Sequence, residues 1–347
     1  MVRFPRTSRF EYVFDFLEAL NEGANQEQIE DRLGKRRIAF QSEKYAALGR
    51  GAPFSEKQKR RLLDAKEIFN ECRKLSYRLG FTDRLGTTLT ASGKHLVRLP
   101  QEAKVPLLMQ TVFESYPIFG TFLLTLKGAP SNEIQLPDVR HTPERRRFRE
   151  LARRNGLNID MLTFAVMRDL LWQAGYVNWY IEKRAVDRED NKSISDGSWY
   201  RVYLTASVTT SRAGEDGCPV SFLDDNQTRC CVRVNEVDEG LFNGILWQEY
   251  LRRTNDVPLR PVFYAELRTA ICTRLRISDR VFDEQIGRLL RTGTPFNVVW
   301  SSGTLPYSKE VASLLKNLPP KSADGQYMVY LKIKLVDNNF RITLPPG

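Results

Sequence analysis

The stretch that most constrains the fold is residues 138–204, in which two helical patterns are followed by two strand-like runs. The first pattern, DVRHTPERRRFRELARRNG, carries mostly positive charge, and the second, LNIDMLTFAVMRDLLWQAGYV, is apolar on most sides. The runs YVNWYIEK and WYRVYLTAS follow, separated by a polar segment. Helix, helix and β-hairpin in this order form the second half of a winged helix-turn-helix unit, so we predict one such unit here.

The rest of the chain shows a similar layout of helices and hairpins. Apolar residues recur at spacings of three and four in most of the predicted helices, and Thr90 and Ser278 stand where N-caps are expected. Proline is expected in the first turn of the helix that begins at Pro261. Outside the central stretch we predict helices over 8–22, 25–30, 55–80, 102–116, 118–126, 241–253, 261–277 and 278–293, and a short helix that Thr90 caps. We also predict a loop over 35–54 and strands over 87–90, 227–234, 296–300 and 327–335.

These elements predict a mainly α fold with small β-hairpins, of the α+β class, built from tandem winged helix-turn-helix units. A segment rich in Ser, Thr, Gly and Asp separates the second unit from the third and is expected to be a linker or an exposed loop. The predicted divisions are unit one at 1–100, unit two at 101–207, the linker at 208–234 and unit three at 235–347.

Composition limits the classes of protein to which the chain can belong. Its 347 residues suggest two or three domains, and its 41% hydrophobic residues suffice for buried cores. No apolar run approaches about 18 residues, and the N-terminus lacks the apolar region of a signal peptide. The five cysteines are odd in number and scattered. We therefore expect a cytoplasmic protein with reduced cysteines and neither a metal site nor a cofactor.

Catalytic motifs are not apparent in the sequence. It shows no nucleophile elbow, P-loop or zinc-protease helix. The nearest approach to a nuclease metal site is Glu182 followed by Lys183, which lacks the required spacing and lies in the predicted hairpin. The absence of a complete motif disfavours an enzyme, although a site-specific nuclease with a divergent metal site stays open.

The net charge of +11 makes a polyanion the expected large partner, and the basic residues cluster. Arg146, Arg149 and Arg153 share one face of the predicted helix over 143–155. A solvated basic face paired with Glu144 and Glu150 is the alternative. The candidate DNA-contacting residues are Lys57, Lys59, Arg60, Arg73, Lys74, Arg145, Arg146, Arg149, Arg153, Arg154, Arg168, Arg280, Gln285, Arg288 and Arg291. We expect the helix over 278–292 to read bases through Gln285 and Arg288, and the first two units mainly to anchor the protein.

The segment RLGFTDRLGTTLTASGKHL, followed by LLMQTVFESYPIFGTFLLTLKG, resembles the DNA-recognition region of type IIS restriction endonucleases of the Fok type. The matching residues are 79–81, Thr90, Gly93, 115–117 and 123–128, and the resemblance covers about residues 75–175. It implies three successive winged-helix subdomains. The separate nuclease domain of that family has no counterpart here, which implies a recognition module that does not cut DNA itself.

The expected function is therefore binding of double-stranded DNA as the recognition subunit of a prokaryotic restriction or phage- or plasmid-defence system. The expected partners are double-stranded DNA and a nuclease, methyltransferase or ATPase subunit, with no membrane. Two alternatives stay open at this point, namely a site-specific restriction endonuclease and a replication initiator or transcriptional regulator.

Overall fold

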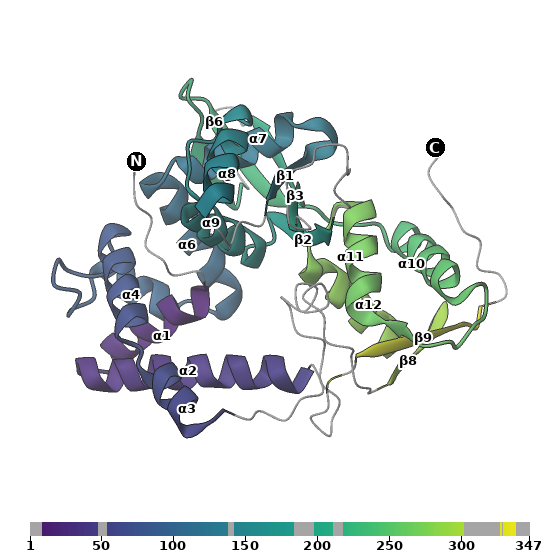
Figure 1. Cartoon of the computed structure of the whole chain (residues 1–347), viewed down its shortest axis with the longest axis horizontal. Coiled ribbons are helices and arrows are strands. Elements are labelled where there is room, and N and C mark those ends of the chain that lie inside the picture. The colour runs from purple at the N-terminus through teal and green to yellow at the C-terminus, as the bar shows by residue number, and fades with distance from the viewer. Residues whose placement is uncertain are drawn as a thin grey trace.

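The computed structural model describes residues 9–47, 54–137, 142–183, 198–210, 218–301, 327 and 329–337, which form a mixed α+β protein. Its elements fall into three groups that follow one another along the chain (Figure 1). The first group is helical, whereas the second and third combine helices with three-stranded antiparallel sheets. The α+β class is therefore confirmed.

The first group contains five helices. α1 buries Val13, Phe16 and Leu17 against the rest of the group, and Thr90 caps α5 as predicted, its side chain accepting from the Gly93 amide at 3.1 Å. The strand predicted over 87–90 is reduced to one isolated bridge between Thr82 and Leu89. The helices are α1 (Phe10–Asn21), α2 (Gln26–Ala47), α3 (Glu56–Leu63), α4 (Lys66–Arg78) and α5 (Ala91–Arg98).

Two boundaries in the first group differ from the prediction. α2 continues to Ala47, so the loop predicted over 35–54 is wrong for its first part. The sequence of this helix has no regular apolar stripe, so periodicity does not predict it. Ion pairs such as Arg36 with Asp15 at 2.7 Å hold the helix to α1. The single helix predicted over 55–80 is broken at Asp64 and Ala65, since α3 packs on α2 while α4 packs on α1.

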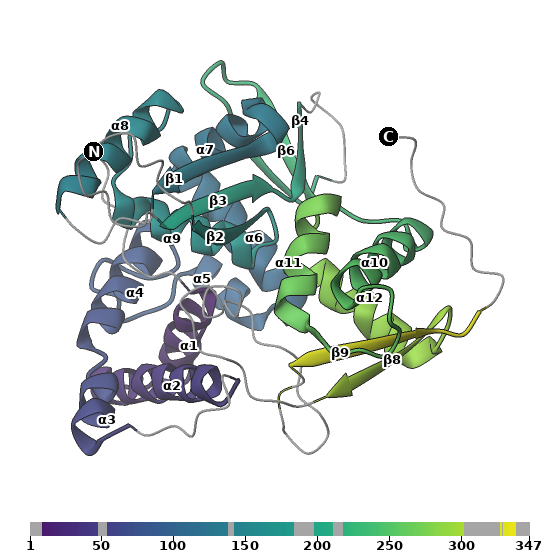
Figure 2. The same ribbon diagram turned by 45° about the vertical axis from the view of Figure 1, so that its right-hand side comes forward.

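The second group confirms the hairpin of the central stretch. β2 and β3 pair in antiparallel register, with Val177 opposite Leu204, and β1 pairs with the other edge of β3 (Figure 2). The sheet order is β1-β3-β2. The elements are α6 (Gln101–Ser115), α7 (Ile118–Gly128), a 3-10 turn (Pro130–Asn132), β1 (Glu133–Pro137), α8 (Thr142–Arg154), α9 (Met161–Gln173), β2 (Val177–Lys183) and β3 (Ser198–Leu204).

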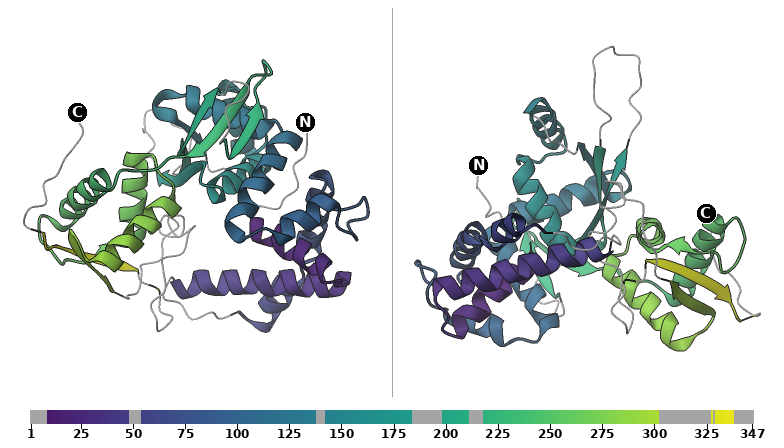
Figure 3. Two further views of the ribbon diagram at one scale, coloured as in Figure 1. Left: turned by 180° about the vertical axis from the view of Figure 1, so that it is seen from behind. Right: turned by 60° about the horizontal axis from the view of Figure 1, so that its bottom comes forward.

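Residues 206–234 are not a linker, because their described part forms a second sheet. β4 (Ala206–Thr210), β5 (Val220–Leu223) and β6 (Arg229–Val234) pair in the order β4-β6-β5. Phe222 stacks on Phe113 of α6 and lies where a side chain at Gly120 of α7 would be. Viewed from behind, the sheet lies across the second group (Figure 3). Of the polar residues that suggested a linker, 211–217 lie outside the described residues, while Asp225 and Asn226 are exposed in the turn between β5 and β6.

The third group has the same order of elements as the stretch from α7 to β3. Both run helix, strand, helix, helix, strand, strand, and the third sheet has the order β7-β9-β8. Ser278 caps α12 as predicted, whereas Pro261 precedes β7 rather than beginning α11. The elements are α10 (Glu239–Thr254), β7 (Val262–Phe263), α11 (Tyr264–Leu275), α12 (Asp279–Thr292), β8 (Phe296–Ser301) and β9 (Tyr330–Leu335).

Buried apolar side chains form two clusters rather than three. One extends from Phe10 to Val232 and the other from Phe242 to Ile333. The first two groups therefore share a core, with no break near residue 100, while the third group has a core of its own.

Two further features bear on the sequence analysis. Cys218 and Cys231 form a disulfide across the β5–β6 region, so the expectation that all cysteines are reduced is wrong for this pair. No single described helix is long and apolar enough to cross a membrane; α6 and α7 reach that length and hydropathy only together, and they are bent by 97° at their junction.

Candidate nucleic-acid interface

The largest concentration of exposed positive charge lies on the first group, over α3, α4, the following turn and α5. Residues 56–98 contain eleven Lys and Arg against five Asp and Glu. Only Arg73 among these basic residues is half-buried, and the others are exposed. The exposed basic residues are Lys57, Lys59, Arg60, Arg61, Lys66, Lys74, Arg78, Arg84, Lys94 and Arg98.

Two of the lysines on this surface form ion pairs with glutamates of their own helices. Lys59 pairs with Glu56 at 2.8 Å and Lys74 with Glu71 at 2.9 Å, each within one helical turn. Both pairs involve exposed lysines, and exposed pairs of this kind contribute about 0.3–0.5 kcal/mol. A phosphate group can therefore compete with the carboxylates for these lysines at small cost.

The turn after α4 is held in one conformation by Asp83. Its Oδ1 accepts from the amides of Thr87 at 2.7 Å and Thr88 at 3.1 Å, and these hydrogen bonds hold the pKa of the carboxyl below its usual range. Gly86 has a φ of +68°, and a Cβ on it would lie 2.2 Å from Cγ of Arg73. Glycine is required here both for this left-handed conformation and for the close approach of Arg73. The turn is thus locked onto α4.

α8 presents a second basic surface on the second group. Arg149, Arg153 and Arg154 are exposed, as the sequence predicted, while Phe148 and Ala152 on the opposite side are fully buried. The side chains of Arg145 and Arg146 lie outside the described residues. α8 therefore keeps at least three guanidinium groups available to an anionic partner.

Arg168 is not a DNA contact, which corrects the prediction. It is 6% exposed, and its guanidinium lies 3.7 Å from the ring centroid of Trp179 and 4.5 Å from that of Tyr200. Asp169 pairs with it at 2.7 Å. The arginine fills the space between α9 and the hairpin, so its charge is used inside the fold.

The predicted reading face of α12 is only partly available. Gln285 is 9% exposed and packs toward the core, so its assignment as a base-reading residue is wrong. Arg280 pairs with Glu284 at 3.5 Å, and Arg288 pairs with Glu239 of α10 at 3.2 Å. Arg291 is exposed and lines a cleft.

The N-terminal end of α12 is fastened to the second group by a buried carboxylate. Asp279 is 4% exposed and accepts from Trp172 Nε1 at 3.2 Å and from Asn178 Nδ2 at 2.7 Å. Arg268, at 1% exposed, lies 3.9 Å from Asp279 and 3.3 Å from Asp283. We call Trp172, Asn178, Asp279, Arg268 and Asp283 the clasp, because they join the two cores.

Burial and charge act against each other within the clasp. Burial raises the pKa of Asp283, even though Arg268 acts to lower it. Tyr264 donates a hydrogen bond to the Asp283 carboxylate, and burial together with that carboxylate raises the pKa of the tyrosine well above its usual value. An ionised arginine between two carboxylates compensates most of the buried charge, which is the condition for such a network to be tolerated.

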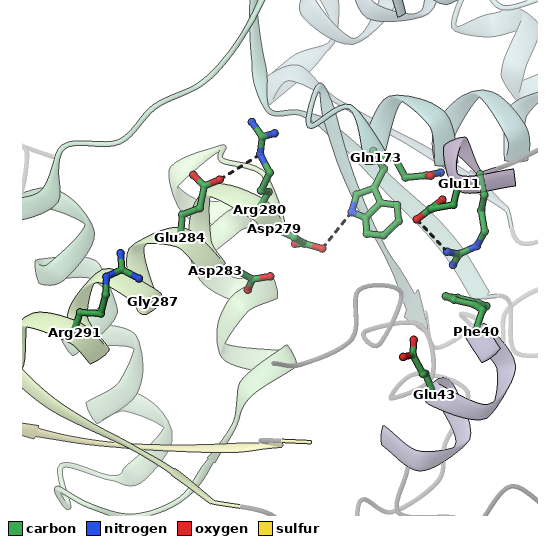
Figure 4. A pocket seen from close by; sticks show the side chains of 12 residues that line it. Glu11, Phe40, Glu43, Gln173, Asp279, Arg280, Asp283, Glu284, Gly287 and Arg291 are labelled. Atoms are coloured by element: carbon green, nitrogen blue, oxygen red, sulfur yellow. Dashed lines mark hydrogen bonds and ion pairs between the residues drawn. The ribbon is translucent and has the colours of Figure 1, made fainter. Parts of the chain in front are cut away.

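A cleft of about 700 Å³ opens beside the clasp, between α12 and the start of the first group (Figure 4). Glu11, Glu43, Asp283 and Glu284 line it together with Arg9, Arg280 and Arg291. Carboxylates exceed guanidinium groups in this lining, four to three, and Asp279 adds a fifth carboxylate, so the cleft is less suited to a phosphate backbone than the first group is. Among the described residues no group of three or more His, Cys, Asp and Glu side chains could hold a metal ion.

Sequence reasoning missed several residues that the structure brings to the surface or to the clasp. Arg61 is exposed on α3, and Lys334 lies on the outer face of β9 opposite Asn297 of β8. The alternation of Lys334 with buried Leu331 and Ile333 could have revealed that residue, whereas α3 has no buried residues to set Arg61 apart. Asp279 gave no such signal, since its partners are about a hundred residues away. No protein-family model, curated protein or solved structure matches this chain.

Proposed function

We propose that this protein binds double-stranded DNA through tandem winged-helix units and acts as the recognition subunit of a prokaryotic restriction or defence system. The observation that carries the proposal is the exposed basic surface of residues 56–98. DNA phosphates are the dense negative charge to which such a surface is suited, and lysine and arginine bind them without regard to sequence.

The repeated topology supports the winged-helix part of the proposal. The order helix, strand, helix, helix, strand, strand, with the last strand in the middle of the sheet, recurs in the second and third groups and is compatible with a winged-helix unit. In the third group the hairpin β8–β9 presents Lys332 and Lys334 opposite Val299 and Asn297 on one face. A basic hairpin face is what a wing needs to lie against the DNA backbone.

The assignment to a restriction or defence system rests on the resemblance of residues 75–175 to the recognition region of Fok-type restriction endonucleases. The matching residues Thr90 and Gly93 serve the cap of α5, and Gly93 lies so close to Phe81 that a Cβ would be 2.1 Å from its carbonyl oxygen. These residues thus support a local structure that this chain and the Fok-type endonucleases would both need. A partner that cuts or modifies DNA completes the proposed system.

The proposal is tested by the salt dependence of binding to a labelled duplex of arbitrary sequence. Each phosphate neutralised contributes about −0.9 to the slope of log K against log salt. Lys57→Gln with Arg60→Gln removes two exposed charges from α3 and should make the slope less steep by roughly 1–2 while leaving the melting temperature unchanged.

The matched control changes two exposed charges far from α3, Lys127→Gln with Arg229→Gln. This variant should bind with the slope of the unaltered protein. A flat salt dependence of the unaltered protein, or equal effects of the two double variants, would contradict the proposal, because either result means that the surface of residues 56–98 makes no special contact with DNA.

A further inference from the structure

The clasp bears on which helix can read a DNA sequence. A winged-helix unit usually inserts its third helix, led by the N-terminal residues, into the major groove. In the third group that helix is α12, and its first residue is Asp279, buried against Trp172 and Asn178. The end of α12 that would enter a groove is therefore covered by the second group.

The corresponding helix of the second group is equally unsuited to reading bases. Among the exposed or half-buried side chains of α9 none is basic, because its one arginine, Arg168, is buried. Its C-terminal end also contacts the first group, where the Phe10 amide donates to Gln173 Oε1 at 3.0 Å. α9 thus lies between α1 and α12 and presents an apolar and acidic surface.

α4 has neither restriction. Its inner face, formed by Phe69, Cys72 and Leu75, is buried, and it lies at the outer edge of the molecule in two views (Figures 1 and 2). Asn70, Lys74 and Tyr77 follow one another at spacings of four and three, which places them on one face. Lys74 and Tyr77 are exposed and Asn70 is half-buried.

The three side chains have the chemistry that base recognition requires. Asparagine can donate to and accept from adenine, lysine can donate to the acceptors of guanine, and an aromatic ring can pack on the thymine methyl group. Tyr77 is 47% exposed, so its ring is accessible to a base edge.

The neighbouring turn fixes the orientation of this face. Arg73 projects from α4 under Gly86, and the hydrogen bonds of Asp83 hold the turn that carries exposed Arg84. Helix and turn therefore form one preorganised surface, which lowers the ordering cost of binding.

We propose that sequence readout resides in α4, with Asn70, Lys74 and Tyr77 as the specificity-determining residues and the turn of residues 82–89 against the adjacent backbone. This inference rests on the proposed function. It replaces the expectation that α12 reads the bases.

The test selects bound duplexes from a pool with a randomised core, first with the unaltered protein and then with Asn70→Ala/Tyr77→Ala. A lost base contact corresponds to about 1–3 kcal/mol of discrimination, so the preference for the selected motif over random duplex should fall at least roughly fivefold. Affinity for random duplex and its salt slope should stay nearly constant. Tyr77→Ala alone, which alters one exposed uncharged side chain, provides the same test if the double variant folds poorly.

The control is Arg280→Ala/Arg291→Ala on the cleft face of α12, which should preserve the motif. Loss of the motif in this control, its survival in the α4 variants, or selection of no motif by the unaltered protein overturns the assignment of readout to α4 and leaves DNA binding itself intact. Failure of the unaltered protein to bind any duplex overturns the proposed function as well.

Discussion

Arg168 and Arg149 show how burial decides what an arginine can contact. The two occupy helices that follow one another in the chain, yet Arg168 is held between Trp179, Tyr200 and Asp169 while Arg149 is exposed. Stacking and pairing make the first a structural residue, and exposure leaves the second available to an anion.

Arg168→Ala is predicted to destabilise the fold without a specific loss of DNA affinity. Removing a buried charged partner costs 3–5 kcal/mol in buried pairs, and the partial exposure of Asp169 places this case near the low end, at about 3 kcal/mol. Chemical denaturation measures the change. Arg149→Ala is the control and should leave stability unaltered; a similar loss in both variants would contradict the different roles of the two arginines.

Glu249 predicts a specific dependence of stability on acid. It is 8% exposed, and Arg252 donates to its Oε2 at 2.9 Å while Arg274 lies 3.4 Å from Oε1. Burial acts to raise the pKa of this carboxyl, but hydrogen bonds from Arg253 and Arg252 outweigh it and hold the pKa below its usual range. A carboxyl with a lowered pKa stabilises the folded state above its unfolded pKa, about 4.3, and loses that contribution as pH falls through the folded pKa.

Glu249→Gln should therefore lower the melting temperature at pH 7 by about 1–2 °C, which corresponds to about 1 kcal/mol for a chain of this size. The difference from the unaltered protein should disappear as pH falls below about 4. Glu266→Gln removes an exposed carboxylate beside the same arginines and should show no such convergence. A difference that stays constant across pH would show that Glu249 acts only through packing.

At the scale of elements, the sheet β4-β6-β5 depends on pairing between distant strands and on one covalent bond. β5 packs on α6, where the Ser221 amide donates to Gln110 Oε1 at 2.8 Å, and the disulfide closes a loop of 13 residues. Closing a loop of about 15 residues is worth about 3 kcal/mol in the chain-entropy model.

Reduction of the disulfide is therefore predicted to lower stability by about 3 kcal/mol. Cys218→Ser/Cys231→Ser should match the reduced protein and no longer respond to reductant. Thiol titration of the unfolded chain should count the three free cysteines before reduction and all five after it. Five thiols without reductant would show that the bond does not form.

At the scale of the whole molecule, two cores are joined through a short clasp. The clasp places a carboxylate from α12 against donors from α9 and β2 and so couples the third group to the other two. Further contacts lie beside it, with Arg276 3.6 Å from Glu133 and Thr273 donating to the Tyr203 hydroxyl at 3.3 Å, so the clasp is the buried part of a larger junction.

Asp279→Ala is predicted to separate the unfolding of the third group from that of the rest. The change removes the buried acceptor of the Trp172 and Asn178 hydrogen bonds and costs on the order of 3 kcal/mol at the interface. Calorimetry should then show two transitions in place of one. Trp172→Phe, which removes a single donor, should give a smaller effect, and Glu284→Ala on the exposed face none; one unchanged transition in all three variants would contradict the coupling.

The sequence by itself determined most of the local structure. Thr90 and Ser278 cap helices because their side chains accept backbone amides within three residues, and β2 and β3 pair because their apolar alternation allows one register. Such interactions depend on neighbours in the chain, so spacing alone predicts them. The predicted α+β class follows from the same local patterns.

Only the tertiary structure decided which residues stay available for function. In the sequence, Arg168 and Gln285 resemble their exposed neighbours, but folding buries both. The polar stretch before Val234 resembles a linker, but the strands β4 and β6 pair there into a sheet. Asp279 meets Asn178 across 101 residues. The free energy gained by burying and pairing such groups depends on which side chains folding places beside them. No periodicity in the sequence indicates those partners.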